Sequence, residues 1–288
     1  MTDRISAKTL LVGLIAEPIR HSLSPTMHNE AFIKLGLDYA YLAFEVGNDN
    51  LEDAVKGIRG LGLVGSNVSM PNKQKILPYL DELSPAAKLT GTVNTVVNVD
   101  GVLTGHITDG TGFMMSLKDA GVDVIGKKMT LFGAGGAGTA IAVQAALDGV
   151  KEISIFNRKD EFFENAENTV KIINENTECK AYLYDLADKG RLRQEISSSY
   201  ILANATGVGM KGDLQDESLV PDASMLRPEL VVADAVYMPP RTKLLQMADE
   251  VGCMTVEGIG MMIYQGAAAF KLFTGHDMPV DYIKELFF

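Results

Sequence analysis

The sequence contains no tryptophan, two cysteines and four histidines among its 288 residues. Cys179 and Cys253 lie far apart and show no C-x-x-C spacing, which argues against a disulfide framework and against a structural zinc site. We therefore expect two reduced thiols, no bound metal and a cytoplasmic protein.

Clusters of positive charge and long apolar runs are also missing. The formal net charge is −11 and no Lys/Arg run occurs, so we expect no nucleic-acid partner. The apolar run Leu10–Ala16 is too short to span a membrane. It is followed by Glu17 and Pro18 instead of the small residues of a signal-peptide cleavage site, so we expect no membrane partner either. The expected partner is a small molecule, and a homodimer is left open.

The length favours two domains, each able to bury a core. Runs typical of strands alternate with runs typical of helices, which predicts an α/β fold with mainly parallel sheets. We expect an α/β substrate-binding domain over 1–106, completed by C-terminal helices over 259–288, and a Rossmann-type dinucleotide-binding domain over 107–258. In the first domain we predict strands at 9–16, 39–46, 63–68 and 93–99, helices at 25–35 and 51–61, and loops at 21–25, 68–73 and 103–109. In the second we predict a helix at 113–120, a strand at 129–132 before the glycines, and further alternating elements at 152–156, 162–173, 179–184, 192–196, 200–205 and 230–236.

Three glycines follow the apolar strand that ends at Phe132. Gly133, Gly135 and Gly138 fit G-x-G-x-x-G, and an Ala-rich helix comes next. The first glycine permits a tight turn, the second lets a pyrophosphate approach the backbone, and the third lets the helix pack on the strand. The helix N-terminus offers N–H groups to the phosphates. We predict dinucleotide binding by the whole loop, namely Gly133, Ala134, Gly135, Gly136, Ala137 and Gly138.

The choice between NAD and NADP depends on residues 157–160, which follow the strand predicted at 152–156. Asp160 lies about twenty residues past the glycines, where an acid binds the adenosine ribose diol in NAD proteins. Arg158, which follows Asn157, is instead what a 2′-phosphate requires. We favour NAD, with NADP as the alternative, because a carboxylate repels a 2′-phosphate.

Several polar residues lie where strands end, the usual place for a ligand in such sheets. Ser22 and Ser24 could grip a small carboxylate, or Ser24 could simply cap the next helix. Lys73, in a proline-stiffened loop, is suited to proton transfer if partly desolvated, or is a solvated surface lysine. Asn94 requires hydrogen bonds if buried, from the backbone or from a ligand hydroxyl. Asp109 is either a helix cap or a carboxylate that works with Lys73.

Taken together, these residues resemble the shikimate dehydrogenase family, and most of all its quinate/shikimate dehydrogenase branch. The match spans nearly the whole chain. Its segments are His-Ser-Leu-Ser-Pro at 21–25, Asn-Val-Ser-Met-Pro-Asn-Lys at 67–73, Val-Asn-Thr at 93–95, Thr-Asp-Gly at 108–110, the glycine loop at 133–138, Phe-Asn-Arg-Lys-Asp at 156–160, Asp-Ala-Val-Tyr at 234–237, Gly258, and Gln-Gly-Ala at 265–267.

The resemblance implies hydride transfer between a nicotinamide and C3 of shikimate, quinate or both, as in aromatic amino acid biosynthesis. It implies that Ser22 and Ser24 hold the substrate carboxylate and that Lys73 with Asp109 handles the hydroxyl proton. The remaining implied contacts are Ser69, Asn94, Tyr237 and Gln265 for the substrate ring, with Ala235 and Gly258 for the cofactor.

The chain departs from the family pattern at four positions. Family members usually carry Asn where this chain has Ile107, Asn where it has Met238, and Thr where it has Ser69; the quinate/shikimate branch can carry Lys where it has Gly207. Ile107 motivates a second hypothesis, a dinucleotide-binding sensor with little turnover. A third hypothesis keeps the enzyme but replaces its substrate with a modified cyclic hydroxy acid.

Overall fold

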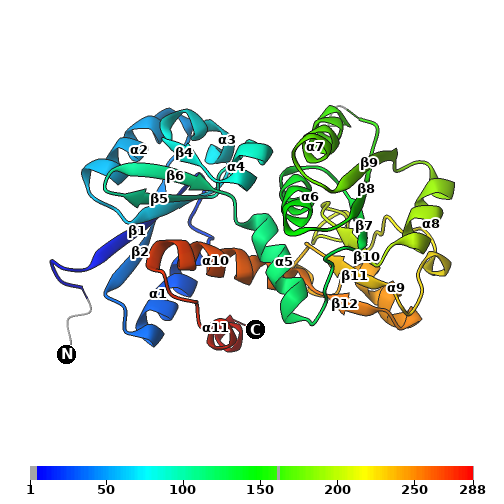
Figure 1. Ribbon diagram of the computed structural model, residues 1–288. Helices are drawn as coiled ribbons and strands as arrows, with labels where there is room; N and C mark the ends of the chain where they lie inside the picture. Colours follow the sequence, from blue (N-terminus) through cyan, green and yellow to red (C-terminus); the bar gives the residue numbers. More distant parts are fainter. Residues whose placement is uncertain (1–4, 161–162, 288) are drawn as a thin grey trace. The chain divides into compact units, whose positions relative to one another are not determined.

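The computed structural model describes residues 5–160 and 163–287 (Figure 1). The chain divides into two compact units. One takes the chain up to Thr108 together with the segment from Gln265 onward, and the other runs from Asp109 to Tyr264. The strand predicted before the glycines and the helix predicted after them both lie in the second unit. Within the described ranges, no helix is long and apolar enough to cross a membrane.

The first unit is built on a mixed six-stranded sheet of order β2-β1-β3-β5-β6-β4. Strand β1 pairs in parallel with both neighbours, whereas β5 runs antiparallel to β3 and β6. Strand β1, which lies between β2 and β3, carries buried Val12, Leu14 and Ile15, as expected where both faces of a sheet are covered. The strands are β1 (Leu10–Ala16), β2 (Tyr39–Glu45), β3 (Gly65–Val68), β4 (Glu82–Leu83), β5 (Thr95–Val99) and β6 (Val102–His106).

Helices link these strands, and two helices from the end of the chain complete the unit. Helix α1 ends at Leu35 because Gly36, with φ +65°, takes the left-handed conformation that closes a helix. His28 and Phe32 of α1 pack against Phe270 of α10, with ring centroids 5.9 and 5.2 Å apart. The helices of this unit are α1 (Ser24–Leu35), α2 (Leu51–Gly60), α3 (Asn72–Lys75), α4 (Pro85–Thr90), the later part of α10 (Gly258–Thr274) and α11 (Val280–Phe287).

The second unit is a doubly wound sheet of order β12-β11-β10-β7-β8-β9, with every pair parallel. From β7 the chain first builds outward through β8 and β9, and then returns to build the other side from β10. This order gives a Rossmann-type sheet whose switch point lies between β7 and β10. Its strands are β7 (Lys128–Phe132), β8 (Glu152–Asn157), β9 (Lys180–Asp185), β10 (Ile201–Asn204), β11 (Val231–Asp234) and β12 (Met254–Val256). Its helices are α5 (Asp109–Asp119), α6 (Gly136–Asp148), α7 (Phe163–Asn176), α8 (Lys189–Ser198), α9 (Lys243–Val251) and the first turns of α10.

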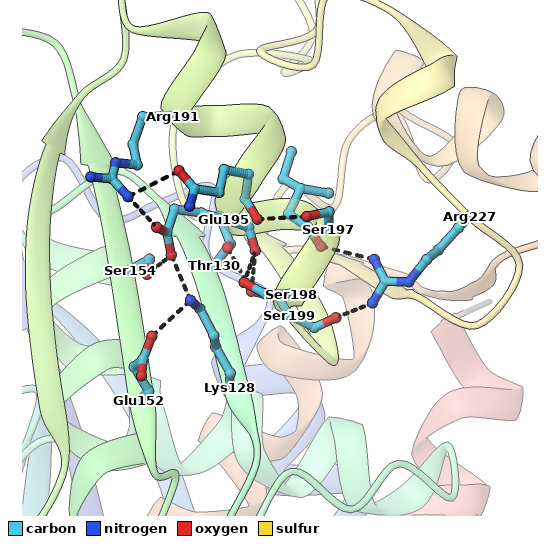
Figure 2. A network of polar contacts seen from close by, with 12 residues as sticks. Lys128, Thr130, Glu152, Ser154, Arg191, Glu195, Ser197, Ser198, Ser199 and Arg227 are labelled. Atoms are coloured by element: carbon cyan, nitrogen blue, oxygen red, sulfur yellow. Dashed lines mark hydrogen bonds and ion pairs between the residues drawn. The ribbon is translucent and has the colours of Figure 1, made fainter.

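A polar network lies at the amino ends of β7 and β8, whereas the glycine loop follows the other end of β7. Figure 2 shows the side chains of this network. The buried carboxylate of Glu195, on α8, accepts hydrogen bonds from Lys128 Nζ at 2.6 Å and Ser154 Oγ at 2.8 Å. Lys128 also pairs with Glu152 at 2.7 Å, and Arg191 with Glu195 at 3.3 Å. The network fixes α8 on the sheet, because the buried Glu195 carboxylate accepts hydrogen bonds from side chains on both β7 and β8.

The predicted α/β fold is confirmed, with differences in detail. In the first sheet three of the five strand pairs are parallel, but β5 runs antiparallel to both of its neighbours, and strands β4 and β6 were not predicted. The loop predicted over 103–109 is wrong in its first part, since β6 continues to His106. Four further elements were not predicted, namely α3, α4, α9 and β12, and α3 replaces the end of the loop predicted over 68–73. The predicted helix at 113–120 begins earlier, at Asp109, and the start predicted for the helix at 162–173 lies outside the described residues.

Candidate substrate and dinucleotide sites

The glycine loop has the geometry that a pyrophosphate requires. Gly133 follows β7 with φ +88°, a left-handed conformation that glycine adopts without strain. A Cβ at Gly138 would lie 2.2 Å from the Gly133 carbonyl oxygen, so the third glycine is required for close packing of α6. A Cβ at Gly135 would meet no atom within 4 Å, and both Gly135 and Gly136 are exposed at the start of α6. Open backbone at a helix N-terminus fits a dinucleotide phosphate.

Side chains from β8 and α7 hold this loop in place. The Ala134 N–H donates to Asn157 Oδ1 at 3.3 Å, and Asn157 is the last residue of β8. The Ala134 carbonyl accepts from Asn165 Nδ2 and from Thr139 Oγ1. The Asn157 side chain therefore positions the loop by accepting a hydrogen bond from the loop's backbone. The sequence pattern alone did not specify this role.

Arg158 and Asp160 lie just past the end of β8 and contact each other. Arg158 Nε is 3.5 Å from Asp160 Oδ2, with side chains 80% and 35% exposed. A guanidinium and a carboxylate are thus both present beside the strand end that usually receives the adenosine ribose. The geometry by itself leaves both NAD and NADP compatible with this segment.

A buried polar cluster shapes the carboxyl ends of β10 and β11. Asp234 accepts from Asn204 Nδ2 at 2.9 Å, from Thr242 Oγ1 at 2.7 Å and from the Val236 N–H at 2.9 Å. Burial raises the pKa of Asp234 to about 6, although these hydrogen bonds oppose the shift. Sequence reasoning missed Asn204 and Thr242 as site-shaping residues. Asn204 could have been found in the sequence, because it is a polar residue at the end of a four-residue strand that is otherwise apolar.

The cluster fixes the segment that follows β11. The Ala235 N–H donates to the Asn204 carbonyl at 2.8 Å, and Tyr237 is 50% exposed two residues later. Gly258, the first residue of α10, approaches this segment so closely that a Cβ there would lie 2.3 Å from the Val236 carbonyl oxygen. Ala235, Tyr237 and Gly258 thus belong to one carboxyl edge of the second sheet.

In the first unit, Ser22 and Ser24 lie at the start of α1. Ser22 Oγ accepts the Ser24 N–H at 3.2 Å. Ser24 is the first residue of α1 and is not its N-cap; Leu23 holds that position without a side-chain bond. The capping alternative for Ser24 is therefore wrong, and the Ser24 hydroxyl instead forms a hydrogen bond with the phenol of Tyr41, whose pKa burial raises above its ordinary value.

That phenol begins a buried chain of hydrogen bonds across the sheet. The Tyr41 hydroxyl donates to Asn67 Oδ1 at 2.8 Å, and Asn67 Nδ2 donates to the Asn94 carbonyl at 3.1 Å. Asn94 Nδ2 donates to Thr108 Oγ1 at 3.0 Å, while Asn94 Oδ1 accepts from the Thr108 N–H at 2.9 Å and from Thr95 Oγ1 at 2.9 Å. Asn94 is thus bonded to protein neighbours and held in a fixed orientation. Tyr41, Asn67 and Thr108 were not predicted as site residues.

The remaining predicted residues lie at helix and strand ends. Ser69 follows β3, and its N–H donates to the Ile15 carbonyl at 3.0 Å. Lys73 is half-buried on α3, and its carbonyl accepts the Val93 N–H at 2.9 Å. Asp109 is the first residue of α5, where a carboxylate complements the helix dipole, and Gln265 lies on α10. Ile107, at the position of the family's usual Asn, is buried.

The strand order and the glycine turn define an α/β protein with a Rossmann-type dinucleotide-binding unit. Comparison with known families narrows the class. The profile of the shikimate dehydrogenase substrate binding domain matches residues 14–96, and that of the shikimate 5'-dehydrogenase C-terminal domain matches residues 258–286.

Individual relatives match over the full length. The chain is 66% identical over 288 residues to "Shikimate dehydrogenase (NADP(+))" of Listeria monocytogenes serotype 4b, covering 100% of this chain and 99% of that protein. A crystal structure of shikimate 5-dehydrogenase from Listeria monocytogenes in complex with shikimate and NAD is 66% identical with a TM-score of 0.98, covering 100% and 99% of the two chains. Quinate dehydrogenase from Corynebacterium glutamicum in complex with NAD is 30% identical with a TM-score of 0.84, covering 97% and 98%. The chain belongs to the shikimate dehydrogenase family, as its motifs predicted.

Proposed function

We propose that this protein is a nicotinamide-dependent dehydrogenase that interconverts shikimate and 3-dehydroshikimate, and that it accepts quinate as a second substrate. The observation that carries the proposal is the full-length similarity to the Listeria structure that holds shikimate and NAD. The open glycine loop supports the dinucleotide part, because it leaves room for a phosphate over Gly135. In this proposal the first unit holds the substrate and the second holds the dinucleotide.

The proposed roles follow from the chemistry of a secondary alcohol. The nicotinamide accepts or supplies the hydride when it is bound. Removing a hydride from C3 requires that the C3 hydroxyl lose its proton, and we assign that proton transfer to Lys73 and Asp109. Ser22 and Ser24 hold the substrate carboxylate through their hydroxyls. The other substrate contacts are Ser69, Asn94, Tyr237 and Gln265, and the Asn94 amide is already oriented by Thr95 and Thr108.

We further propose that NAD is the preferred cofactor and that NADP is also used. Asp160 favours the ribose diol of NAD because its carboxylate repels a 2′-phosphate, whereas the exposed Arg158 guanidinium can pair with one. The Listeria structure contains NAD, while the name of the 66% identical relative specifies NADP(+). Asp160→Ala should narrow the ratio of kcat/KM for NAD over NADP, and Arg158→Ala should widen it. An unchanged ratio in both variants would refute these assignments.

The reaction is tested by following NADH formation with shikimate and with quinate. Lys73→Ala should lower kcat by about 10²–10⁴-fold, the usual contribution of a positioned acid or base. Lys75→Ala is the matched control, since it removes an exposed lysine from the same short helix. Near-normal turnover in Lys73→Ala would remove Lys73 from the mechanism. Tight NADH binding without turnover of any ring acid would instead support the sensor hypothesis.

A further inference from the structure

Helices α5 and α6 cross in backbone contact at Gly110. A Cβ added to Gly110 would lie 2.2 Å from the Ala140 carbonyl oxygen, 2.8 Å from its carbonyl carbon and 2.6 Å from Gln144 Cβ. Real Cβ atoms do not come this close to a backbone atom, so no residue larger than glycine fits without moving a helix. Gly110 is buried, and Thr111 Oγ1 lies 3.3 Å from Gln144 Oε1 at the same crossing.

The two helices carry different parts of the proposed machinery. Asp109, assigned to proton transfer, is the first residue of α5 and directly precedes Gly110. Helix α6 begins at Gly136, in the glycine loop, and Ala140 lies one turn further on. The crossing therefore ties the backbone of Asp109 to the helix that presents the dinucleotide loop. Both helices belong to the second unit.

We propose that Gly110 is a positioning residue for the dehydrogenase reaction: its missing side chain sets the distance between the Asp109 carboxylate and the dinucleotide-binding loop. The inference rests on the proposed function. Restoring an allowed contact for an added methyl group needs a shift of roughly 1 Å, since the closest tolerated Cβ contacts begin near 3.0 Å. A misplacement of about 1 Å can cost roughly 10²-fold in rate.

Gly110→Ala tests the proposal, with Gly190→Ala as the matched control. Gly190 is also helical, on α8 of the same unit, but a Cβ there meets only Asp188 Oδ1 at 3.5 Å, an ordinary contact. We expect Gly110→Ala to lower kcat for shikimate oxidation about 10–100-fold. NADH affinity, measured by fluorescence titration, should change less than about threefold, since the loop stays on α6. Gly190→Ala should leave both quantities unchanged.

A second measurement separates positioning from simple destabilisation. Asp109→Glu extends the carboxylate by one methylene, so on its own it should lower kcat. In the Gly110→Ala background the longer side chain should offset the displacement of the helix, so the same substitution should lower kcat much less or raise it. Independent, multiplicative effects of the two substitutions would overturn the proposal, as would near-normal kcat in Gly110→Ala. A parallel loss of NADH binding and kcat would also overturn it, because that pattern marks damage to the whole unit.

Two further outcomes are covered by the same measurements. If Gly110→Ala shows no cooperative thermal transition, Thr111→Val serves as the milder variant, because it removes the hydroxyl that faces Gln144 at this crossing. It should lower kcat while retaining NADH affinity, and unchanged kcat there would overturn the inference. A lack of turnover by the unaltered protein would refute the proposed function, whereas activity that survives in the α5 variants would refute only the role of Gly110.

Discussion

Removing the Glu195 carboxylate should destabilise the second unit strongly, although it lies far from any proposed ligand contact. Glu195 accepts hydrogen bonds from Lys128 and Ser154, and Lys128 also forms an ion pair with Glu152 (Figure 2). In Glu195→Ala, the buried Ser154 hydroxyl loses its acceptor and Lys128 keeps a single carboxylate. Burial alone would raise the pKa of Glu195, but the hydrogen bonds from Lys128 and Ser154 hold that pKa below its ordinary value.

The expected size of the effect follows from this geometry. Breaking a buried ion pair by removing one partner costs about 3–5 kcal/mol, because the other charge stays buried without compensation. Lys128 retains Glu152 at 2.7 Å, so we expect the lower end, about 3 kcal/mol. For a domain of this size, about 1 kcal/mol shifts the melting temperature by roughly 2–4 °C. Glu195→Ala should thus melt roughly 6–12 °C lower.

The assay is thermal and urea unfolding followed by circular dichroism, with Glu52→Ala as the control. Glu52 pairs with Lys56 at 2.8 Å on the solvent-facing side of α2, with side chains 57% and 65% exposed, and such pairs contribute only about 0.3–0.5 kcal/mol. Glu195 lies in the second unit and Glu52 in the first, so the loss in each variant is read from the unit that carries its substitution. Equal, small losses in the two variants would refute the argument that burial gives the Glu195 network its strength.

Three further predictions concern pH and packing. Because the pKa of Glu195 is lowered in the folded state, the ionised carboxylate stabilises the protein above the ordinary pKa of about 4.3, and this stabilisation is lost as the pH falls. The difference in unfolding free energy between Glu195→Gln and the unaltered protein, measured in urea, should therefore shrink below about pH 4. A difference that stays constant with pH would contradict this prediction. The pKa of Asp234 is raised to about 6, so the native state binds an extra proton and this group's contribution to stability declines as pH rises from about 4 to 6. Carbon-13 NMR should find its carboxyl midpoint near 6, whereas a midpoint below 4 would contradict the burial argument. Gly138→Ala should lower the free energy of unfolding by about 1–3 kcal/mol, because the new methyl group would meet the Gly133 carbonyl oxygen at 2.2 Å. Gly57→Ala, where the space is open, should not, and equal stability of the two variants in urea unfolding would refute the packing role of Gly138.

The parallel strands of the second unit could be predicted because their apolar runs are buried on both faces. The first sheet was harder. The turn Asp100-Gly101, with φ of 50° and 87°, joins β5 to β6, and Asp-Gly between apolar residues is a strong hairpin signal. The loop predicted over 103–109 conflicts with this signal, because β6 continues to His106 and pairs antiparallel with β5.

The glycine loop could be predicted because its constraints are local: a left-handed turn, an open backbone and a helix packed on a strand lie within six residues. The buried networks could not, because their partners are distant in sequence. Tyr41 and Asn67 are 26 residues apart, and Asn204 and Asp234 are 30 apart. Only the folded sheet brings such pairs to neighbouring strands. The roles of Lys73 and Asp109 remain predictions.

The polar network around Glu195 and the glycine loop lie at opposite ends of the same strands. Lys128 and Glu152 open β7 and β8, whereas Gly133 and Asn157 lie at their far ends. Heat tolerance of this unit can consequently be tuned at one end without disturbing recognition chemistry at the other. Laboratory selection for survival at elevated temperature should accumulate changes around Lys128, and selection for a new nicotinamide preference should accumulate them around Arg158.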